Sequence, residues 1–296
     1  MELDRPLLVA RADILAVRRG ALEKTRFEAL WLAGSLEGLR LRTVAIVGSR
    51  APSDGARARA HELGKTLASR GLCVVSGLAL GIDGAAHSGA LAGGGPTIGV
   101  LGGGHRQFFP RRNRALAEAM IANGGAVLSP FAPDEPAFPS RFLERNGIVA
   151  ALAEAVVIVE AAVRSGAHNT ASWAGNLDVD VLAFPGDVDR PKAAGCNALI
   201  RDGATLVRGP DDVLEALGLG AAAPAGSPGQ RGEAGPREPI EQHILGVLAD
   251  GPAAFDTLFD HAEFPASQLG AALGRLELEG AIERRGGALY ALRSSH

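Results

Sequence analysis

The sequence holds few cysteines, few aromatic residues and no long apolar run. Its two cysteines, Cys73 and Cys196, lie far apart in apolar surroundings, which argues against a disulfide framework and a zinc module. It has no run of roughly eighteen apolar residues, which a membrane-spanning helix would need. The first ten residues carry acidic side chains where a signal peptide would have basic ones. The pattern predicts a soluble, cytoplasmic protein.

The charge balance excludes a protein that holds nucleic acid through a general positive field. The chain has 30 Lys and Arg against 33 Asp and Glu, a net charge of −3 at pH 7. A phosphate-bearing partner must therefore be bound locally. Nearly all the cations are arginines, since the lysines are only Lys24, Lys65 and Lys192. The planar guanidinium suits phosphate binding and base stacking, although a genome of high GC content produces the same bias.

Residues 43–218 show the pattern of an α/β domain, in which seven short apolar runs alternate with helix-sized segments. The runs are TVAIVG, LCVVSG, TIGVLG, AVLSP, AVVIVEA, VLAFPG and TLVRG. This alternation predicts a Rossmann-like parallel sheet with helices on both faces. Residues 1–42 have only short apolar-periodic stretches, so we expect a short N-terminal helical appendage there.

Beyond residue 218 the composition changes twice. Residues 219–238 are rich in Pro, Gly, Ala and Ser, which predicts a flexible linker. Residues 239–296 contain three helical stretches and then a ribbon of two strands that turns at Gly286-Gly287. Three helices followed by a hairpin are typical of a small C-terminal winged-helix domain.

The strongest local signal is the triplet Gly48-Ser49-Arg50, which directly follows the first strand of the predicted sheet and precedes a helix capped by Ser53. In open α/β sheets ligands bind beyond the carboxyl ends of the strands, where helix N-termini present free N–H groups to anions. Gly48 would let a ligand approach the backbone, Ser49 offers a hydroxyl and Arg50 a permanent charge. The alternative is that Gly48 only makes a tight turn and Arg50 is solvated.

Other segments rich in glycine and polar residues fall at equivalent strand ends, at residues 76–83, 101–113 and 160–171. Their convergence on one rim predicts a phosphate-lined pocket or groove. The segment FPSRFLERN, at 138–146, adds Arg141, Phe142 and Arg145. An aromatic ring there can stack on a base, but phenylalanines spaced four apart more often belong to a core.

Three signals for other chemistry fail on inspection. Gly64-Lys65-Thr66 lies inside a predicted helix and lacks the first glycine of a P-loop. The three glycines at 102–104 lack the spacing and the acidic residue of a dinucleotide site. The histidines have no metal-binding spacing, and His87 is interpreted as a helix-packing residue. We therefore predict no metal and no cofactor.

Catalytic machinery is equally hard to find. Ser76 and Ser165 lack a nucleophile elbow and a partner base. Asp83 and Glu160 are at the predicted rim, where acid–base work is one possibility. The favoured interpretation is that Asp83 caps its helix and that Glu160 orients a neighbouring backbone or arginine.

The order of the motifs resembles that of the DNA-processing protein A (DprA/Smf) family. The motifs are VAIVGSR, VVSGLALGID, TIGVLGGG, FFPRRN, SRFLERN, VVIVEA, RSGAHNTA, AFPGDV and GCNALIRDGA. The resemblance implies a non-enzymatic recombination mediator that binds and protects incoming single-stranded DNA and loads the RecA recombinase in natural transformation. It also implies a homodimer formed through the Rossmann-like domain.

The resemblance and the rim together predict a set of DNA-binding residues. They are Gly48, Ser49, Arg50, Arg141, Phe142, Arg145, Asn146, Ser165, Gly166 and Thr170. The chain departs from the family where a second arginine usually follows Arg-Asn, because Gly147 stands there. A lost guanidinium removes one possible phosphate contact.

Two other hypotheses remain for comparison. One is a Rossmann-like enzyme that hydrolyses nucleotides, but the Pro-Gly-Gly-x-Gly-Thr loop typical of such enzymes is absent from the sequence. The other is a scaffold that works only through the winged helix. That predicted domain has eight acidic residues and four arginines, hence a net charge of −4. We expect it to contact a partner rather than to bind duplex DNA strongly, with Arg284 and Arg285 as its candidates for phosphate contact.

Overall fold

The computed structural model describes most of the chain, which divides into two compact units, Met1–Pro224 and Ala225–His296. The described residues are 2–219, 239–249, 251–260, 264–265, 268–270, 272–273, 276, 281–285 and 289–292. The predicted linker, apart from Leu219, lies outside the described residues, and so does the predicted turn at Gly286-Gly287. Each unit is described separately.

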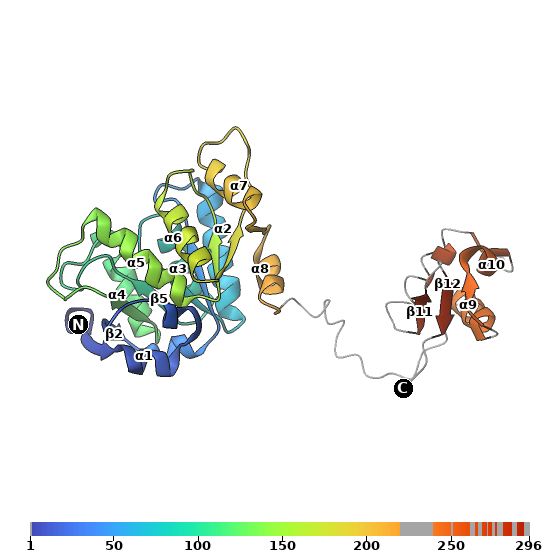
Figure 1. The fold of residues 1–296 in the computed structure, drawn as a ribbon, viewed down its shortest axis with the longest axis horizontal. Helices are drawn as coiled ribbons and strands as arrows, with labels where there is room; N and C mark the ends of the chain where they lie inside the picture. The colour runs from blue at the N-terminus through green and yellow to red at the C-terminus, as the bar shows by residue number, and fades with distance from the viewer. Residues whose placement is uncertain are drawn as a thin grey trace. The chain divides into compact units, whose positions relative to one another are not determined.

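The first unit is built on a nine-stranded sheet with the order β1-β2-β6-β5-β4-β3-β7-β8-β9 (Figure 1). The strands from β3 to β9 are parallel to one another and coincide with the seven predicted runs. They are β3 (Thr43–Val47), β4 (Cys73–Ser76), β5 (Thr97–Val100), β6 (Ala126–Ser129), β7 (Ala155–Ile158), β8 (Asp180–Ala183) and β9 (Thr205–Leu206). The prediction of a mostly parallel sheet is confirmed.

Helices cover both faces of this sheet. They are α2 (Asp54–Ser69), α3 (Ile82–Ala92), α4 (Arg114–Ala122), α5 (Pro139–Leu152), α6 (Gly166–Asn176), α7 (Ala194–Arg201) and α8 (Pro210–Ala216). Alternate residues of β3 enter different cores: Ala45 and Val47 pack with α5 and α6, whereas Val44 and Ile46 pack with α2, α3 and α8. Burial on both faces explains why the strand sequences are mostly apolar rather than alternating between apolar and polar residues.

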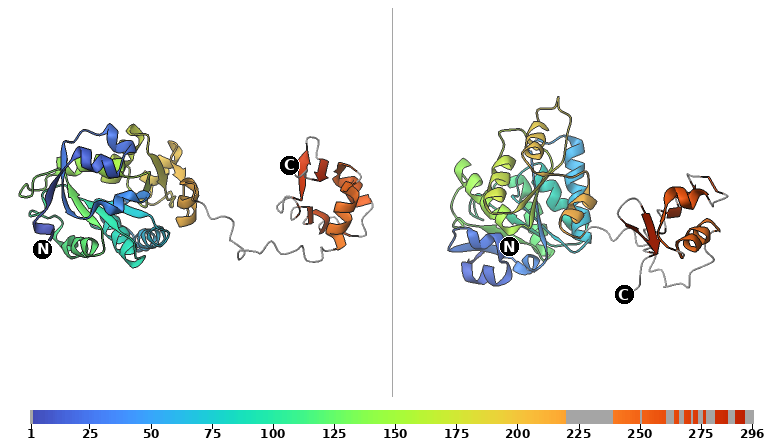
Figure 2. Two further views of the ribbon diagram at one scale, coloured as in Figure 1. Left: turned by 90° about the horizontal axis from the view of Figure 1, so that it is seen from below. Right: turned by 45° about the vertical axis from the view of Figure 1, so that its right-hand side comes forward.

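The N-terminal residues differ from the expected helical appendage. They form η1 (Glu2–Asp4), β1 (Leu7–Ala10), α1 (Arg11–Val17), η2 (Gly20–Lys24), β2 (Ala29–Gly34) and η3 (Leu36–Arg40). β2 pairs antiparallel with β6, and β1 pairs with β2, so both strands extend the sheet. Ile14, Leu22 and Leu30 are fully buried in its core. Figure 2 shows these dark blue segments packed against the rest of the unit.

The second unit contains α9 (Pro239–Ala249), β10 (Ala253–Ala254), α10 (Phe255–Asp260), β11 (Ile282–Arg285) and β12 (Leu289–Leu292), with further helical residues between 268 and 276. Its strands form a small sheet with the order β10-β12-β11. Ile244, Leu258 and Leu276 are among the buried residues of its own core. The side chains of Arg284 and Arg285 lie outside the described part.

Candidate functional site

The turn after β3 places Gly48, Ser49 and Arg50 at the carboxyl end of the sheet. A Cβ at Gly48 would lie 2.7 Å from the Ile82 side chain and 2.9 Å from the Glu160 carbonyl oxygen. The Ser49 N–H donates to that same carbonyl at 2.7 Å. Close packing against α3 and the loop after β7 therefore requires glycine at position 48. The Arg50 side chain is exposed at the end of this fixed turn.

Glu160 holds the chain between this turn and α2. Its carboxylate accepts hydrogen bonds from the Ser53 N–H at 3.1 Å and from the Ser53 hydroxyl at 2.7 Å. Ser53 in turn caps α2, because its hydroxyl oxygen accepts from the Ala56 N–H at 3.3 Å. Glu160 thus orients a neighbouring backbone, as the sequence suggested, and fixes the segment that follows Arg50.

Asp83 and Arg145 form a buried charged layer under the rim. The Asp83 carboxylate accepts from the N–H groups of Gly77 at 3.1 Å and Ala79 at 3.3 Å, both in the loop before its own helix. Burial raises the pKa of this carboxyl, against the opposing effect of the Arg145 charge and of these hydrogen bonds. Asp83 therefore fixes the loop that leads into α3 rather than capping α3, whose N-cap is Gly81.

Arg145 is only 3% exposed. Its Nη1 donates to the carbonyl oxygens of Gly77 and Val100, at the ends of β4 and β5. Burial lowers the pKa of the guanidinium to about 10, while the Asp83 charge opposes this shift. Arg145, which was predicted to contact phosphate, thus uses its guanidinium to bind the backbone at the ends of two strands.

A cavity of about 250 Å³ joins most of the predicted residues. Eight of the ten line it: Gly48, Ser49, Arg50, Arg145, Asn146, Ser165, Gly166 and Thr170. The structure adds Lys192, whose ammonium donates to the Ala51 carbonyl at 2.5 Å from a segment 141 positions along the chain. The sequence marked Lys192 only as one of three lysines, and nothing in its local pattern connects it to the Gly48 turn.

Polar side chains from α5 and α6 close the other side of this cavity. Ser165 caps α6, and its hydroxyl accepts from the His168 N–H at 3.4 Å. The Asn146 amide donates to the Gly166 carbonyl at 3.2 Å. Thr170 donates to the same carbonyl, also at 3.2 Å. The start of α6 is thereby tied to α5, with its first N–H groups beside the cavity.

Arg141 and Phe142 are absent from the lining of this cavity. The Arg141 guanidinium donates to the Glu135 carboxylate and, at 2.8 Å, to the Pro136 carbonyl. Phe142 is half-buried, and the Arg50 guanidinium carbon lies 5.0 Å from the centre of its ring. The structure therefore joins Phe142 to the site through Arg50, whereas Arg141 is paired at the start of α5.

Two further aromatic side chains were missed by the sequence interpretation. Phe109 is 53% exposed, and its ring centroid lies 6.0 Å from that of Phe142. Trp173 lies over Gly147, where a Cβ would be 3.0 Å from the indole. The space beside residue 147 is thus already filled by Trp173, which explains why a small residue stands there.

His87 lies beneath the rim on α3. It is fully buried, and its Nδ1 is 2.7 Å from the Thr97 hydroxyl oxygen. Burial lowers its pKa to about 3, with a smaller contribution from the Arg145 charge. The side chain is therefore neutral and packs inside the sheet layer.

Among the described helices, none combines the length and hydropathy that crossing a membrane requires.

Comparisons of the sequence and the structure with known proteins match this chain to one family. The profile of the DNA recombination-mediator protein A family matches residues 22–218, and that of the DprA winged helix domain matches residues 228–288. Protein Smf of Escherichia coli K12 is 37% identical over 272 residues, which cover 90% of this chain and 72% of that protein. DprA of Streptococcus pneumoniae R6 is 40% identical over 185 residues, covering 62% and 65% respectively.

Two solved structures of similar proteins agree with these matches. The X-ray structure of Streptococcus pneumoniae DprA superposes with a TM-score of 0.65 at 35% identity, covering 72% of this chain and 75% of that one. A Helicobacter pylori DprA structure, described as giving insight into a single-stranded DNA binding mode, has a TM-score of 0.60 at 28% identity and covers 71% and 92%.

Proposed function

The chain belongs to the DNA recombination-mediator protein A family, and on this premise we propose that it binds single-stranded DNA at the rim built around Arg50. The supporting observation is the position of Arg50. This exposed guanidinium has no ion-pair partner within the described part of the chain, and it lines a cavity beside the first N–H groups of α6. Free N–H groups and a free guanidinium are suitable ligands for phosphate.

Arg50 also provides a link from phosphate to base. It lies over the Phe142 ring, and that ring is close to the exposed Phe109. Successive bases of a single strand stack on aromatic side chains without sequence preference. We propose that Arg50 binds the DNA backbone while Phe142 faces the bases.

The experiment is a titration of oligo-dT against the wild type and Arg50→Ala at two salt concentrations. Loss of one phosphate contact lowers the salt slope of binding to a single strand by about 0.7. The affinity should fall roughly fivefold at 0.1 M salt for the same reason. Arg70→Ala is the matched control, because Arg70 is an exposed arginine at the far end of α2. Equal binding by wild type and Arg50→Ala would refute the proposed site.

We propose further that the protein is a mediator and not an enzyme. Both acidic groups at the rim, Asp83 and Glu160, accept hydrogen bonds from backbone N–H groups, which leaves neither in the role of a free general base. By analogy with its family, the protein would protect incoming DNA in the cytoplasm, dimerise through the first unit and pass the strand to RecA in natural transformation. The predicted acidic winged helix would then serve partner contact.

A further inference from the structure

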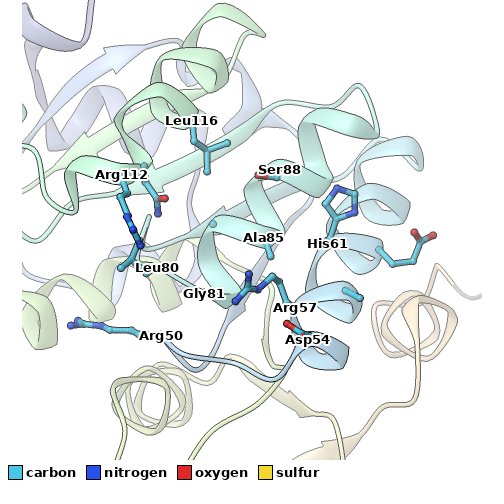
Figure 3. Close-up of a pocket in the computed structure, with 14 residues that line it drawn as sticks. Arg50, Asp54, Arg57, His61, Leu80, Gly81, Ala85, Ser88, Arg112 and Leu116 are labelled. Atoms are coloured by element: carbon cyan, nitrogen blue, oxygen red, sulfur yellow. The ribbon is translucent and has the colours of Figure 1, made fainter.

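A second and larger cavity, of about 1040 Å³, opens beside the first (Figure 3). It is an open groove over α2 and α3, bounded on its far side by the segment that leads into α4. Arg50 lines both cavities. Arg50 therefore connects the first cavity with this groove, which we name the α2–α3 groove.

The groove is open because its floor carries only small side chains. Glycines bring α2 and α3 close together: a Cβ at Gly64 would lie 2.3 Å from the Ala86 carbonyl oxygen, and one at Gly89 would lie 2.0 Å from that of His61. Toward the start of both helices, Gly84, Ala85 and Ser88 of α3 and Ala58 of α2 line the groove. Without long side chains there, a chain as thick as a nucleic-acid backbone has room to lie between the walls.

Arginines from three separate segments converge on one end of this groove. Arg50 follows β3, Arg57 is in the first turns of α2, and Arg112 belongs to η4 (Arg111–Asn113). Figure 3 shows them around Leu80 and Gly81, with His61 at the opposite end. All three side chains are exposed, and none has an ion-pair partner among the described residues.

The carboxylates in the groove do not cancel this charge. Asp54 and Glu62 also line it, so the three arginines exceed the two carboxylates by one charge in a chain whose net charge is −3. Neither carboxylate lies within ion-pair distance of Arg57 or Arg112. Other exposed arginines of this unit are paired, as Arg106 is with Asp134, or unpaired among the described residues, as Arg70 is; the groove differs because three unpaired arginines line one cavity. Three unpaired guanidiniums at one groove are a local anion site.

We propose that the α2–α3 groove binds the next segment of single-stranded DNA, with Arg57 and Arg112 contacting phosphates beyond the one held by Arg50. This rests on the proposed function of the Arg50 rim. The strand leaves the first cavity past Arg50 and follows the arginine end of the groove, with Leu80 and Leu116 as apolar contacts for sugar or base. The two cavities together form one continuous binding path.

Oligo-dT of two lengths separates this proposal from the proposed function. The variant is Arg57→Ala with Arg112→Ala. On oligonucleotides of about 20 nucleotides it should lower the salt slope by about 1.4 and the affinity at 0.1 M salt more than tenfold. On oligonucleotides of about 6 nucleotides, which fill one such site, it should bind as the wild type does. Arg50→Ala should weaken both lengths.

The matched control removes two positive charges from the α2 segment outside the groove. Lys65 and Arg70 are exposed on α2 and lie outside the groove, so Lys65→Ala with Arg70→Ala should leave binding of the long strand within about twofold. If both double variants weaken binding equally, the effect is a general loss of charge and the groove proposal is wrong. If Arg50→Ala weakens binding but Arg57→Ala with Arg112→Ala does not, the groove fails while the rim stands.

A fluorescent label gives a readout that does not depend on losing charge. Ala58 is exposed and lines the groove, whereas both native cysteines are buried. A dye attached to the Ala58→Cys variant should change its emission with long oligo-dT and not with short oligo-dT. An unchanged emission on saturating binding of the long strand would overturn the proposal, because the strand would then bypass the groove.

Discussion

Arg50 and Arg145 are two of the three arginines predicted to contact DNA, and the structure gives them opposite environments. Arg50 is exposed, touches an aromatic ring and has no described ion-pair partner. Arg145 is almost fully buried and donates to two carbonyl groups at the ends of β4 and β5. One guanidinium is available to a ligand, and the other holds the strands on which the first one is displayed.

This difference separates binding from support. Beneath Arg50, Arg145 forms a polar layer with Asp83 and His87, in which the charges interact inside the protein. A buried charge pair adds little net stability, but losing one partner is costly because the other remains uncompensated. Substitutions in the buried layer should therefore change folding, and substitutions on the exposed layer should change DNA binding.

Arg145→Met gives the largest effect expected. It leaves the carbonyls of Gly77 and Val100 without their donor and the buried Asp83 carboxylate without the nearby Arg145 charge, which should lower the free energy of unfolding by about 3–5 kcal/mol. Urea denaturation measures this loss. Adding Asp83→Asn removes the orphaned charge and should restore part of the stability.

The same variant tests the comparison directly. At a temperature where Arg145→Met remains folded, its salt slope for oligo-dT should equal that of the wild type, because the guanidinium contacts no phosphate. A stable Arg145→Met protein with a reduced salt slope would reverse the roles of the two arginines. It would place the phosphate contact on α5.

The buried layer should also make stability depend on pH. The pKa of His87 is about 3 in the folded protein, against 6.5 for an ordinary histidine. Below pH 6.5 His87 is protonated in the unfolded chain but stays neutral in the folded protein. The free energy of unfolding therefore falls as the pH falls toward 3. The loss between pH 6.5 and about pH 4.5 is about 2.5 kcal/mol.

His87→Gln isolates this contribution, since an amide can also hydrogen-bond to Thr97. Burial lowers the pKa of His105 as well, so both proteins retain a common acid sensitivity. The free energy of unfolding of the wild type minus that of the variant should fall by about 2.5 kcal/mol between pH 6.5 and about pH 4.5. Denaturation of both proteins across this pH range measures the change. A constant difference would mean that His87 is accessible to protons.

The sequence predicted the sheet well because the physical signal is local. Runs such as TVAIVG are nearly continuous in apolar residues, as is typical of parallel strands covered on both faces, and all seven contain parallel strands in the structure. The gathering of Gly48, Asn146 and Ser165 at one cavity follows from the same rule, because parallel strands end at one edge.

Burial and long-range pairing could not be predicted in this way. Arg145 is buried by carbonyls that lie 68 and 45 positions away. Residues 29–34 lie within the predicted helical appendage, but they form β2 because the edge of β6 offers a partner. Both outcomes depend on contacts between distant segments, on which local residue patterns carry no information.

Substitution of Arg141 has the smallest expected effect. It tests whether an arginine that is paired in the free protein supports the structure or binds DNA. It is a predicted DNA contact, yet its guanidinium is paired with Glu135 and lies 4.6 Å from the Phe131 ring. The pair is partly exposed, so Arg141→Ala should change the free energy of unfolding by at most about 1 kcal/mol. Oligo-dT affinity should change less than about twofold, with the salt slope kept. A salt slope lowered by about 0.7 would instead show that Arg141 leaves Glu135 to bind a phosphate. An ion pair in the free protein would then not distinguish a supporting arginine from a DNA-binding one at the start of α5.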